Sequence, residues 1–332
     1  MTKEKIGSLI VIVLKIILIL FLIVTLNKVV MPKYISENQD GRITGEYYRS
    51  AKYDDVIFVG SSTVFSGINP GILWEKEGIS SFVRANASQP MWITYYMVED
   101  ALRCRKPELV CIDTTFIKYD DDFVEEPSSR KSIDGMRLSL SKINCIKASM
   151  GEDEKMLEYI IPLFRFHTRW KELKWEDIRY AWYNRPVTLN GYIEDTVVEG
   201  TDDELIYTAQ ARDISPKNVE YLRKTIELCQ SKGVSVFVFK MPSHSPNWND
   251  DFDRQINGIA GEYGVTYINF DKFNDDIGLD YTTDTPDAGS HLNSSGAAKF
   301  SEYLAKYIRD NYNITDRRSD RSYGNYWNKI IK

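Results

Sequence analysis

Two stretches far apart in the chain carry residue types that could perform nucleophilic chemistry. A Gly-Ser-Ser sequence at residues 60–62 directly follows a short apolar run. The loop before the last helical stretch holds His291 together with two carboxylates, Asp284 and Asp287. Serine is a weak nucleophile until a base removes its proton, and a histidine oriented by a carboxylate is the usual base. These residue types predict a Ser-His-Asp site, provided that the fold brings the two stretches together.

The apolar run at residues 56–59 predicts where the serines lie. A continuous apolar run is typical of a buried strand in a parallel sheet. Ligands bind beyond the carboxyl ends of such strands, so the serines would lie at the mouth of a site. An ordinary strand-to-helix turn is the competing interpretation, because serines are common in turns. The chain has three histidines, and His244, which follows another predicted strand, is the alternative base.

Alternating strands and helices predict a three-layer α/β domain of flavodoxin-like type with a five-stranded parallel sheet. The predicted strands are residues 56–59, 82–85, 109–113, 234–239 and 265–269. The predicted helices are residues 70–76, 91–105, 216–232, 253–263 and 295–311. Ser215 and Pro216 are typical of a helix start, and Gly233 is typical of its end.

The N-terminal residues 6–26 are apolar except at four positions, which is about the length needed to cross a bilayer. No small-x-small sequence follows, so we expect an uncleaved anchor rather than a secretory signal. Basic residues flank both ends, so the charge bias leaves the orientation open. Lys15 lies inside the run. We expect it to snorkel toward the headgroups, and contact with a membrane partner is the alternative.

The expected organisation is an anchor at residues 1–31, a connector at 32–53, the α/β domain at 54–314 and a tail at 315–332. The tail is either an ordered element or a frayed end. Residues 119–213 break the strand–helix alternation and are expected to form a largely helical insertion, with helices at 152–166 and 170–183. The insertion is expected to cap the site, and a peripheral elaboration is the alternative.

The densest part of this insertion is an aromatic and basic cluster at residues 164–170, which contains His167 and Arg169. Guanidinium and aromatic groups could bind sugar rings or a phosphate-bearing polymer. A structural packing role is the alternative.

Composition excludes some classes of function. The net charge of −6 argues against a nucleic-acid surface, and 43% hydrophobic with 27% charged residues is ordinary for a globular protein. The four cysteines lack metal-type spacing and are expected to be buried free thiols. The sequence indicates no metal and no organic cofactor.

Taken together, the motifs resemble those of the SGNH/GDSL hydrolase superfamily. Gly60-Ser61-Ser62-Thr63 is similar to its first block, residues 84–90 to its second and residues 287–293 to its last. The resemblance covers roughly residues 54–118 and 214–311. The Gly-Ser-Ser start, the His-Leu-Asn end and the anchor look most like the DltD-like and alginate-acetylation-like branch. Members of that branch work outside the cytoplasmic membrane on acylation of surface polymers.

The resemblance implies roles for individual residues. Ser62, rather than Ser61, takes the nucleophile position, and His291 takes that of the base. Ser62 and Ser88 would supply backbone N–H groups to the oxyanion hole, with Ser88 at a position where the family usually has glycine. Thr115 stands where the family has asparagine and would donate its hydroxyl. This departure puts fast hydrolysis in doubt.

The acid partner also departs from the family pattern. The superfamily usually places Asp three residues before His, and Ala288 occupies that position here. Asp287 is the expected partner of His291 and Asp284 is the alternative. Either would reach if the loop bulges by a residue, which Gly289 makes easy.

The function implied is that of a membrane-anchored, single-pass, extracytoplasmic serine acyl-esterase or acyltransferase acting on a cell-envelope polysaccharide or teichoic-acid-like polymer. Asn86, Gln89, His167 and Arg169 are the candidate substrate-binding residues. A multispanning membrane O-acyltransferase is the partner that the resemblance implies. The alternatives are a non-catalytic glycan-binding or scaffold protein of an O-acylation complex and a membrane-bound lipase or esterase.

Overall fold

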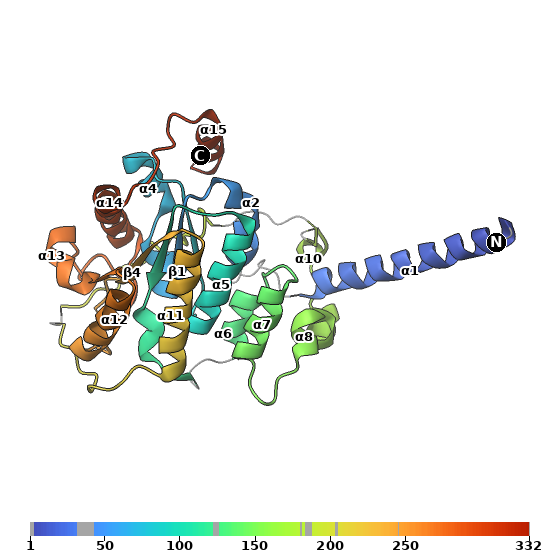
Figure 1. Cartoon of the computed structure of the whole chain (residues 1–332), viewed down its shortest axis with the longest axis horizontal. Helices are drawn as coiled ribbons and strands as arrows, with labels where there is room; N and C mark the ends of the chain where they lie inside the picture. Colours follow the sequence, from blue (N-terminus) through green and yellow to red (C-terminus); the bar gives the residue numbers. More distant parts are fainter. Residues whose placement is uncertain are drawn as a thin grey trace. The chain divides into compact units, whose positions relative to one another are not determined.

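The computed structural model describes residues 3–31, 43–121, 126–179, 181–182, 188–202, 205–244 and 246–331 (Figure 1). The chain divides into two compact units. One combines Met1–Asn38 with Glu152–Arg185, and the other combines Gln39–Gly151 with Pro186–Lys332. The second unit is an α/β domain that contains both stretches of the predicted site.

The α/β unit is built on a five-stranded, fully parallel sheet with strand order β2-β1-β3-β4-β5. The strands are β1 (Val56–Gly60), β2 (Ser81–Ala85), β3 (Leu109–Asp113), β4 (Ser235–Lys240) and β5 (Thr266–Asn269). The same order is found in flavodoxin-like doubly wound sheets. All five predicted strands are confirmed to within two residues at each end. The strand order reverses between β1 and β3, so a ligand site is expected at their carboxyl ends.

Helices cover both faces of the sheet, which confirms the three layers (Figure 1). In β1, Ile57 and Val59 pack into one apolar cluster and Val56 and Phe58 into the other, because successive side chains of a strand point to opposite faces. The first face is covered by α2 (Ile43–Ser50), α5 (Met91–Cys104), α11 (Pro216–Ser231) and α12 (Asp250–Glu262). The second is covered by α3 (Ser62–Gly67), α4 (Pro70–Glu77) and α14 (Ser294–Asn311).

Capping side chains set the helix ends next to the sheet. Asn69 accepts a hydrogen bond from the N–H of Gly71 at the start of α4, and Pro70 occupies its first turn. Asn293 accepts from two backbone N–H groups at the start of α14. The last cap matters for the site, because it fixes where the loop carrying His291 ends.

The expected connector is wrong for residues 43–53, which form α2 and the short 3-10 helix η2 (Ala51–Tyr53). Ile43 and Tyr47 are fully buried, and the Tyr47 ring packs edge-on against Phe82, with 5.3 Å between ring centroids. These residues therefore belong to the core of the α/β unit. Residues 32–42 lie outside the described residues.

The tail is ordered rather than frayed. Residues 321–330 form α15 (Arg321–Ile330), in which Trp327 is fully buried. Its indole stacks on Trp74 with 5.3 Å between centroids and donates a 2.9 Å hydrogen bond to Ser80. Arg317 binds the buried carboxylate of Asp55 at 2.6 Å.

The expected insertion is divided between the two units. Residues up to 151 contribute α6 (Glu126–Ile133) and α7 (Leu140–Ser149), and α7 packs against α5. Residues 152–185 join the N-terminal unit as α8 (Met156–Ile160), α9 (Pro162–Phe166), η5 (His167–Lys171) and α10 (Trp175–Arg179). The predicted helix at 152–166 is interrupted because a residue before proline, here Ile161, disfavours helical geometry. A capping role stays a prediction.

The N-terminal unit contains α1 (Lys3–Val30), which is long and apolar enough to cross a membrane. Its most apolar window is exposed along its whole length. A helix of this kind is not a core helix, and it suggests a membrane anchor.

All four cysteines are free thiols. Cys111, Cys145 and Cys229 are buried as expected, but the expectation is wrong for Cys104, which is exposed at the last turn of α5. Helical periodicity places Cys104 on the solvent face of α5.

The remaining short elements of the α/β unit follow strands β3 and β5. They are η3 (Thr115–Lys118), η6 (Phe270–Phe273) and α13 (Asn274–Ile277). Both 3-10 helices begin at the carboxyl edge of the sheet, where the site is expected.

Candidate active site

The fold brings Ser62, His291 and Asp287 into one chain of hydrogen bonds. Ser62, the first residue of α3, has its Oγ 2.7 Å from Nε2 of His291. Nδ1 of the same imidazole lies 2.6 Å from Oδ2 of Asp287. An ionised carboxylate can only accept a hydrogen bond, so Asp287 favours the tautomer with hydrogen on Nδ1 and leaves Nε2 free to accept the serine proton.

A bulged loop lets Asp287 reach His291. Ala288 and Gly289 both adopt positive φ angles, of 54° and 96°, which turn the chain sharply between the two residues. The other carboxylate oxygen of Asp287 accepts a 2.9 Å hydrogen bond from the backbone N–H of His291. The hydroxyl of Thr285 accepts from the backbone N–H of Gly289 at 2.7 Å, which fixes the turn from inside.

The electrostatics of the pair favour an ionised Asp287. Partial burial raises the pKa of the Asp287 carboxyl, but the hydrogen bond and the charge interaction with His291 outweigh it and hold the pKa below its ordinary value. Asp287 is therefore ionised at neutral pH. A negative carboxylate stabilises the imidazolium that forms when His291 takes a proton.

The alternative carboxylate has a different role. Asp284 is fully buried, and its Oδ2 lies 2.6 Å from Nζ of Lys299. The same oxygen accepts a 2.8 Å hydrogen bond from the backbone N–H of Asp280. Asp284 therefore ties its loop to α14, and Asp287 is the carboxylate in contact with His291.

Residues 195–201, part of the expected insertion, support the histidine loop from the outside. Glu199 exchanges backbone hydrogen bonds with the loop, donating to Thr285 at 3.0 Å and accepting from Ala288 at 2.8 Å. A Cβ atom on Gly200 would lie 2.1 Å from the carbonyl oxygen of Thr282, so only glycine fits this close approach. Sequence reasoning missed this support, because the segment has no strand or helix periodicity, and Gly200 was the one available signal.

The competing serine and histidine have other partners. Ser61 is buried, and its Oγ lies 3.2 Å from the hydroxyl of Thr63. His244 packs its ring against Tyr281, with 5.0 Å between centroids, and its backbone N–H donates to Gly289 at 2.6 Å. His244 thus helps to hold the loop that carries His291.

A cleft of about 260 Å³ opens at Ser62. Its lining is dominated by hydroxyl groups, with one ammonium group from Lys118. The lining residues are Ser61, Ser62, Thr63, Ser88, Thr115, Phe116, Lys118, Tyr119, Ser243, Asn247, Ser290 and His291. The expected oxyanion residues Ser62, Ser88 and Thr115 are therefore brought to the same cleft.

Ser88 has a glycine-like backbone. Its φ angle is 53°, in the left-handed region that costs an L-residue about 1–2 kcal/mol. Strained residues of this kind cluster at functional sites, where the surrounding structure holds them. The strain agrees with the expectation that Ser88 occupies a position where glycine would be usual.

Thr115 does not offer its hydroxyl hydrogen to the cleft. Its Oγ1 donates to Oδ1 of Asp113 at 2.6 Å, and its backbone N–H donates to the same oxygen at 3.1 Å. A Cβ on Gly60 would lie 2.6 Å from the Cβ of Asp113, so the glycine before the serines leaves room for this side chain. The expected third oxyanion donor is therefore engaged at the end of β3.

The second-block residues Asn86 and Gln89 do not line the cleft. Both are buried. Nδ2 of Asn86 lies 3.2 Å from Oε1 of Gln89, and Gln89 donates to Thr94 at 3.0 Å. Both side-chain amides donate hydrogen bonds inside the core, although Oδ1 of Asn86 accepts none within the described residues, and substrate contact by this pair stays a prediction.

The other two expected substrate residues, His167 and Arg169, belong to the N-terminal unit. Nδ1 of His167 lies 3.0 Å from the carbonyl oxygen of Phe164. The guanidinium of Arg169 donates to the carbonyl of Val30 at 2.6 Å and lies 3.4 Å from Asp177. These contacts favour the packing role that was the alternative for the cluster.

Lys118 is a cleft residue that sequence reasoning missed. It is only 8% exposed, and burial together with the nearby charge of Lys240 lowers the pKa of its ammonium to about 8. A lysine five residues beyond the end of a buried strand was the available signal. It gives the cleft a positive charge near neutral pH.

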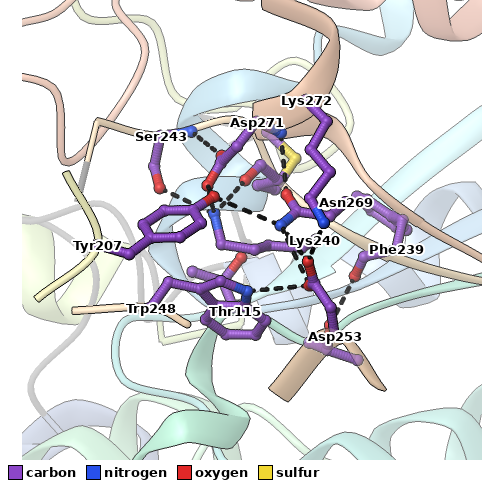
Figure 2. A network of polar contacts seen from close by, with 12 residues as sticks. Thr115, Tyr207, Phe239, Lys240, Ser243, Trp248, Asp253, Asn269, Asp271 and Lys272 are labelled. Atoms are coloured by element: carbon purple, nitrogen blue, oxygen red, sulfur yellow. Dashed lines mark hydrogen bonds and ion pairs between the residues drawn. The ribbon is translucent and has the colours of Figure 1, made fainter. Parts of the chain in front are cut away.

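A buried ion pair lies beneath the cleft at the carboxyl end of β4 (Figure 2). Nζ of Lys240 lies 2.5 Å from Oδ2 of Asp271 and 3.1 Å from Oγ of Ser243. Asp271 in turn accepts from the backbone N–H of Ser243 at 2.8 Å and from the hydroxyl of Tyr207 at 2.6 Å. The pair therefore positions Ser243, which lines the cleft.

Across the ranges that the structure describes, His, Cys, Asp and Glu side chains form no group of three or more that could hold a metal ion. The chemistry available at the cleft is that of the serine, the histidine, the carboxylate and the lysine.

The fold and the site define an α/β protein with a hydrogen-bonded serine, histidine and aspartate at the carboxyl edge of a parallel sheet. No family model matches the chain, and no curated protein matches it.

Proposed function

We propose that the protein is a membrane-anchored serine acyl-esterase or acyltransferase that works by a Ser-His-Asp mechanism. The observation that carries the proposal is the pair of contacts on one imidazole, 2.7 Å to Ser62 and 2.6 Å to Asp287. A nucleophile bonded to a base, with the base oriented by a third group, is the general signature of nucleophilic catalysis.

In this mechanism Ser62 Oγ attacks the carbonyl carbon of an acyl donor while its proton passes to Nε2 of His291. The backbone N–H groups of Ser62 and Ser88 hold the developing oxyanion. The imidazolium then gives the proton to the leaving oxygen, which departs and leaves an acyl group on Ser62. A hydroxyl of the acceptor, or water, loses a proton to His291 and takes the acyl group, which restores the free serine.

The lack of a third hydrogen-bond donor in the oxyanion hole affects the expected rate of hydrolysis. Loss of one oxyanion donor can raise a barrier by about 3 kcal/mol, and the Thr115 hydroxyl is engaged with Asp113. We expect slow turnover with water. The same donor is missing when a hydroxyl acceptor attacks, so an acceptor competes with water through its high effective concentration when it is bound in the cleft.

The proposed type of enzyme is the SGNH hydrolase that the sequence motifs resemble, in its DltD-like or alginate-acetylation-like form. The parallel sheet, the serine after β1, the left-handed Ser88 and the histidine before α14 support it. The substrate class is then a cell-envelope polysaccharide or a teichoic-acid-like polymer. The partner is a multispanning membrane O-acyltransferase.

We further propose that the α/β unit acts outside the cytoplasmic membrane and that α1 stays attached. Residues 152–182 support retention of α1, because they pack on its C-terminal part. Leu163 donates a backbone hydrogen bond to the side chain of Asn27 at 2.9 Å, and Arg169 binds the carbonyl of Val30. Cleavage after α1 would remove these partners.

A fluorophosphonate probe tests the chemistry. The full-length chain, in membranes and with its membrane partner co-expressed, should add the probe to Ser62, as read by intact mass and peptide mapping. Ser62→Ala and His291→Ala should each abolish labelling while leaving the melting transition in place. The double variant should lose no more than either single one, because the residues act as a unit.

Ser61→Ala is the matched control, because it removes a neighbouring buried hydroxyl that does not touch His291, and it should retain labelling. A chain whose Ser62 stays unlabelled, and in which Ser62→Ala still supports polymer acylation in cells, would be a binding or scaffold protein instead. Rapid turnover of a soluble ester with water as sole acceptor would identify a plain membrane-bound esterase or lipase.

A further inference from the structure

The segment at residues 152–182 exposes large apolar side chains. Among the described residues of this segment, six such side chains are more than half exposed. They are Leu157 (51%), Phe164 (53%), Trp170 (65%), Trp175 (69%), Ile178 (51%) and Trp182 (55%). Large apolar side chains that are exposed in such number within one short segment favour a site that another surface or a membrane covers.

The tryptophans of the chain divide sharply between the two units. The chain has seven, and the three in this segment are each at least 55% exposed. The four in the α/β unit are at most 8% exposed, and they are Trp74, Trp92, Trp248 and Trp327. Exposure of indole rings is therefore specific to the unit that contains α1.

The segment packs against the C-terminal part of α1. The Trp182 ring stacks on Phe21, with 5.7 Å between centroids and 8° between planes. The ammonium of Lys28 lies 3.8 Å from the centre of the same indole. Leu163 and Arg169 bind the last turns of the helix through Asn27 and Val30.

The position of these contacts along α1 sets their depth. The hydrocarbon core of a bilayer is about 30 Å thick and takes about 20 residues of helix, which residues 6–26 supply. With a rise of 1.5 Å per residue, Phe21 then lies about 7 Å inside the boundary at residue 26, and Lys28 lies in the headgroup layer. Trp182 spans this boundary, with its ring on Phe21 and beside Lys28.

We propose that residues 152–182 form a collar that lies in the membrane interface at the C-terminal end of α1, with the lipid bilayer covering its exposed aromatic and aliphatic side chains. Tryptophan is enriched at this depth, because its ring is apolar and its N–H is polar. Lys171 and Lys174 are exposed in the same stretch, alongside exposed Glu172 and Glu176, and the two ammonium groups would contact lipid phosphates. The bilayer is favoured over a protein partner because the collar is continuous with the span itself.

The collar would hold the N-terminal unit at a fixed height on the membrane. Several short helices that insert aromatic side chains resist the rotation and tilt that a single span allows. The proposal depends on the anchor and not on the chemistry at Ser62, so the two fail or hold independently.

Tryptophan quenching in the full-length chain tests the collar. The protein is reconstituted in vesicles of phosphatidylcholine and phosphatidylglycerol, with or without lipids brominated near the headgroup end of the acyl chains. The collar predicts that brominated lipid quenches part of the emission and that aqueous iodide adds little to it. Trp170→Phe/Trp175→Phe/Trp182→Phe should reduce the lipid-dependent quenching several-fold.

Trp92→Phe is the matched control, because Trp92 is buried and its indole nitrogen makes no hydrogen bond within the described residues. It should leave the lipid-dependent quenching unchanged. Quenching of the wild type by iodide and not by brominated lipid would overturn the proposal and place the segment in water. Protection from both quenchers would also overturn it and would indicate that a protein surface, such as a second copy of the chain, covers the segment. These readouts on the wild type decide the matter even if the triple variant does not fold.

Discussion

Oδ2 of Asp287 lies 2.6 Å from Nδ1 of His291, across a turn in which Ala288 and Gly289 both have positive φ angles. Three residues of ordinary extended loop would carry the carboxylate away from the ring. The turn shortens that path and also aims the backbone N–H of His291 at the same carboxylate. The bulge therefore lets an aspartate four residues before the histidine reach the imidazole ring.

The first prediction separates the two carboxylates. Asp287→Asn should lower the rate of Ser62 acylation by about 10³–10⁴-fold, because an amide can hold His291 in the wrong tautomer. The melting temperature should stay close to that of the wild type, since Asp287 lies at the surface of its loop. Stopped-flow or timed labelling with the probe measures the rate.

Asp284→Asn should show the reverse pattern. It removes the buried charge that pairs with the partly exposed Lys299, and we expect a loss of about 1–3 kcal/mol in the free energy of unfolding. Labelling of the folded fraction should continue. A severe loss of labelling in Asp284→Asn together with a mild one in Asp287→Asn would reject the assignment.

The second prediction concerns the strained residue at the cleft. Ser88 has a φ angle of 53°, so Ser88→Gly should relieve backbone strain and keep the N–H in place. We expect labelling to continue at a similar rate and stability to change by about 1 kcal/mol or less, because relief of strain opposes the added freedom of the unfolded chain.

Ser88→Val is the contrasting variant. A β-branched side chain tolerates left-handed geometry poorly, and the backbone at this position would have to move out of the cleft. Labelling of Ser62 should fall by at least tenfold. Equal labelling of the Val and Gly variants would show that the N–H of Ser88 is not an oxyanion donor.

The sequence predicted β1, β3 and β4 well because each contains four consecutive apolar residues, whereas β2 and β5 have shorter apolar runs and follow from the strand–helix alternation. It predicted Ser62 and His291 because short motifs surround them. It missed α2, because the buried Tyr47 lies in a stretch whose remaining residues are mostly polar. It also missed the support from Glu199 and Gly200, which depends on backbone hydrogen bonds between segments about 85 residues apart, and these leave no periodic pattern.

The third prediction concerns the buried pair beneath the cleft (Figure 2). Lys240→Met would leave the carboxylate of Asp271 buried without its partner charge, so we expect the free energy of unfolding to fall by about 3–5 kcal/mol. Labelling of Ser62 should also slow, because Ser243 loses an anchor. Asp271→Asn should restore part of the stability when combined with Lys240→Met.

Lys272→Met is the matched control. Its ammonium contacts Asp253 at 2.7 Å, but the Lys272 side chain is 52% exposed, and exposed pairs contribute about 0–1 kcal/mol. Urea unfolding of the full-length chain in detergent compares the variants. Similar losses in the free energy of unfolding for Lys240→Met and Lys272→Met would show that the buried pair stabilises the fold no more than the exposed one.

The last prediction concerns pH and the buried carboxyl of Asp54. Burial raises its pKa to about 7, against a smaller opposing effect of the hydrogen bond from Ser50 and the charge of Arg105. The folded state therefore binds a proton that the unfolded state releases near pH 4. The stabilising contribution is complete below about pH 4 and is lost as the pH rises to about 7.

Asp54→Asn mimics the protonated carboxyl and cannot titrate. One pKa unit corresponds to about 1.4 kcal/mol. As the pH rises from 5 to 8, the free energy of unfolding of the variant should therefore increase by about 2–3 kcal/mol relative to that of the wild type. Taking the difference in the free energy of unfolding between variant and wild type at each pH cancels the contributions of the titrating groups that both chains share. Glu75→Gln, at an exposed position, should track the wild type across the same range. A difference between Asp54→Asn and the wild type that stays constant from pH 5 to pH 8 would show that Asp54 titrates outside this interval.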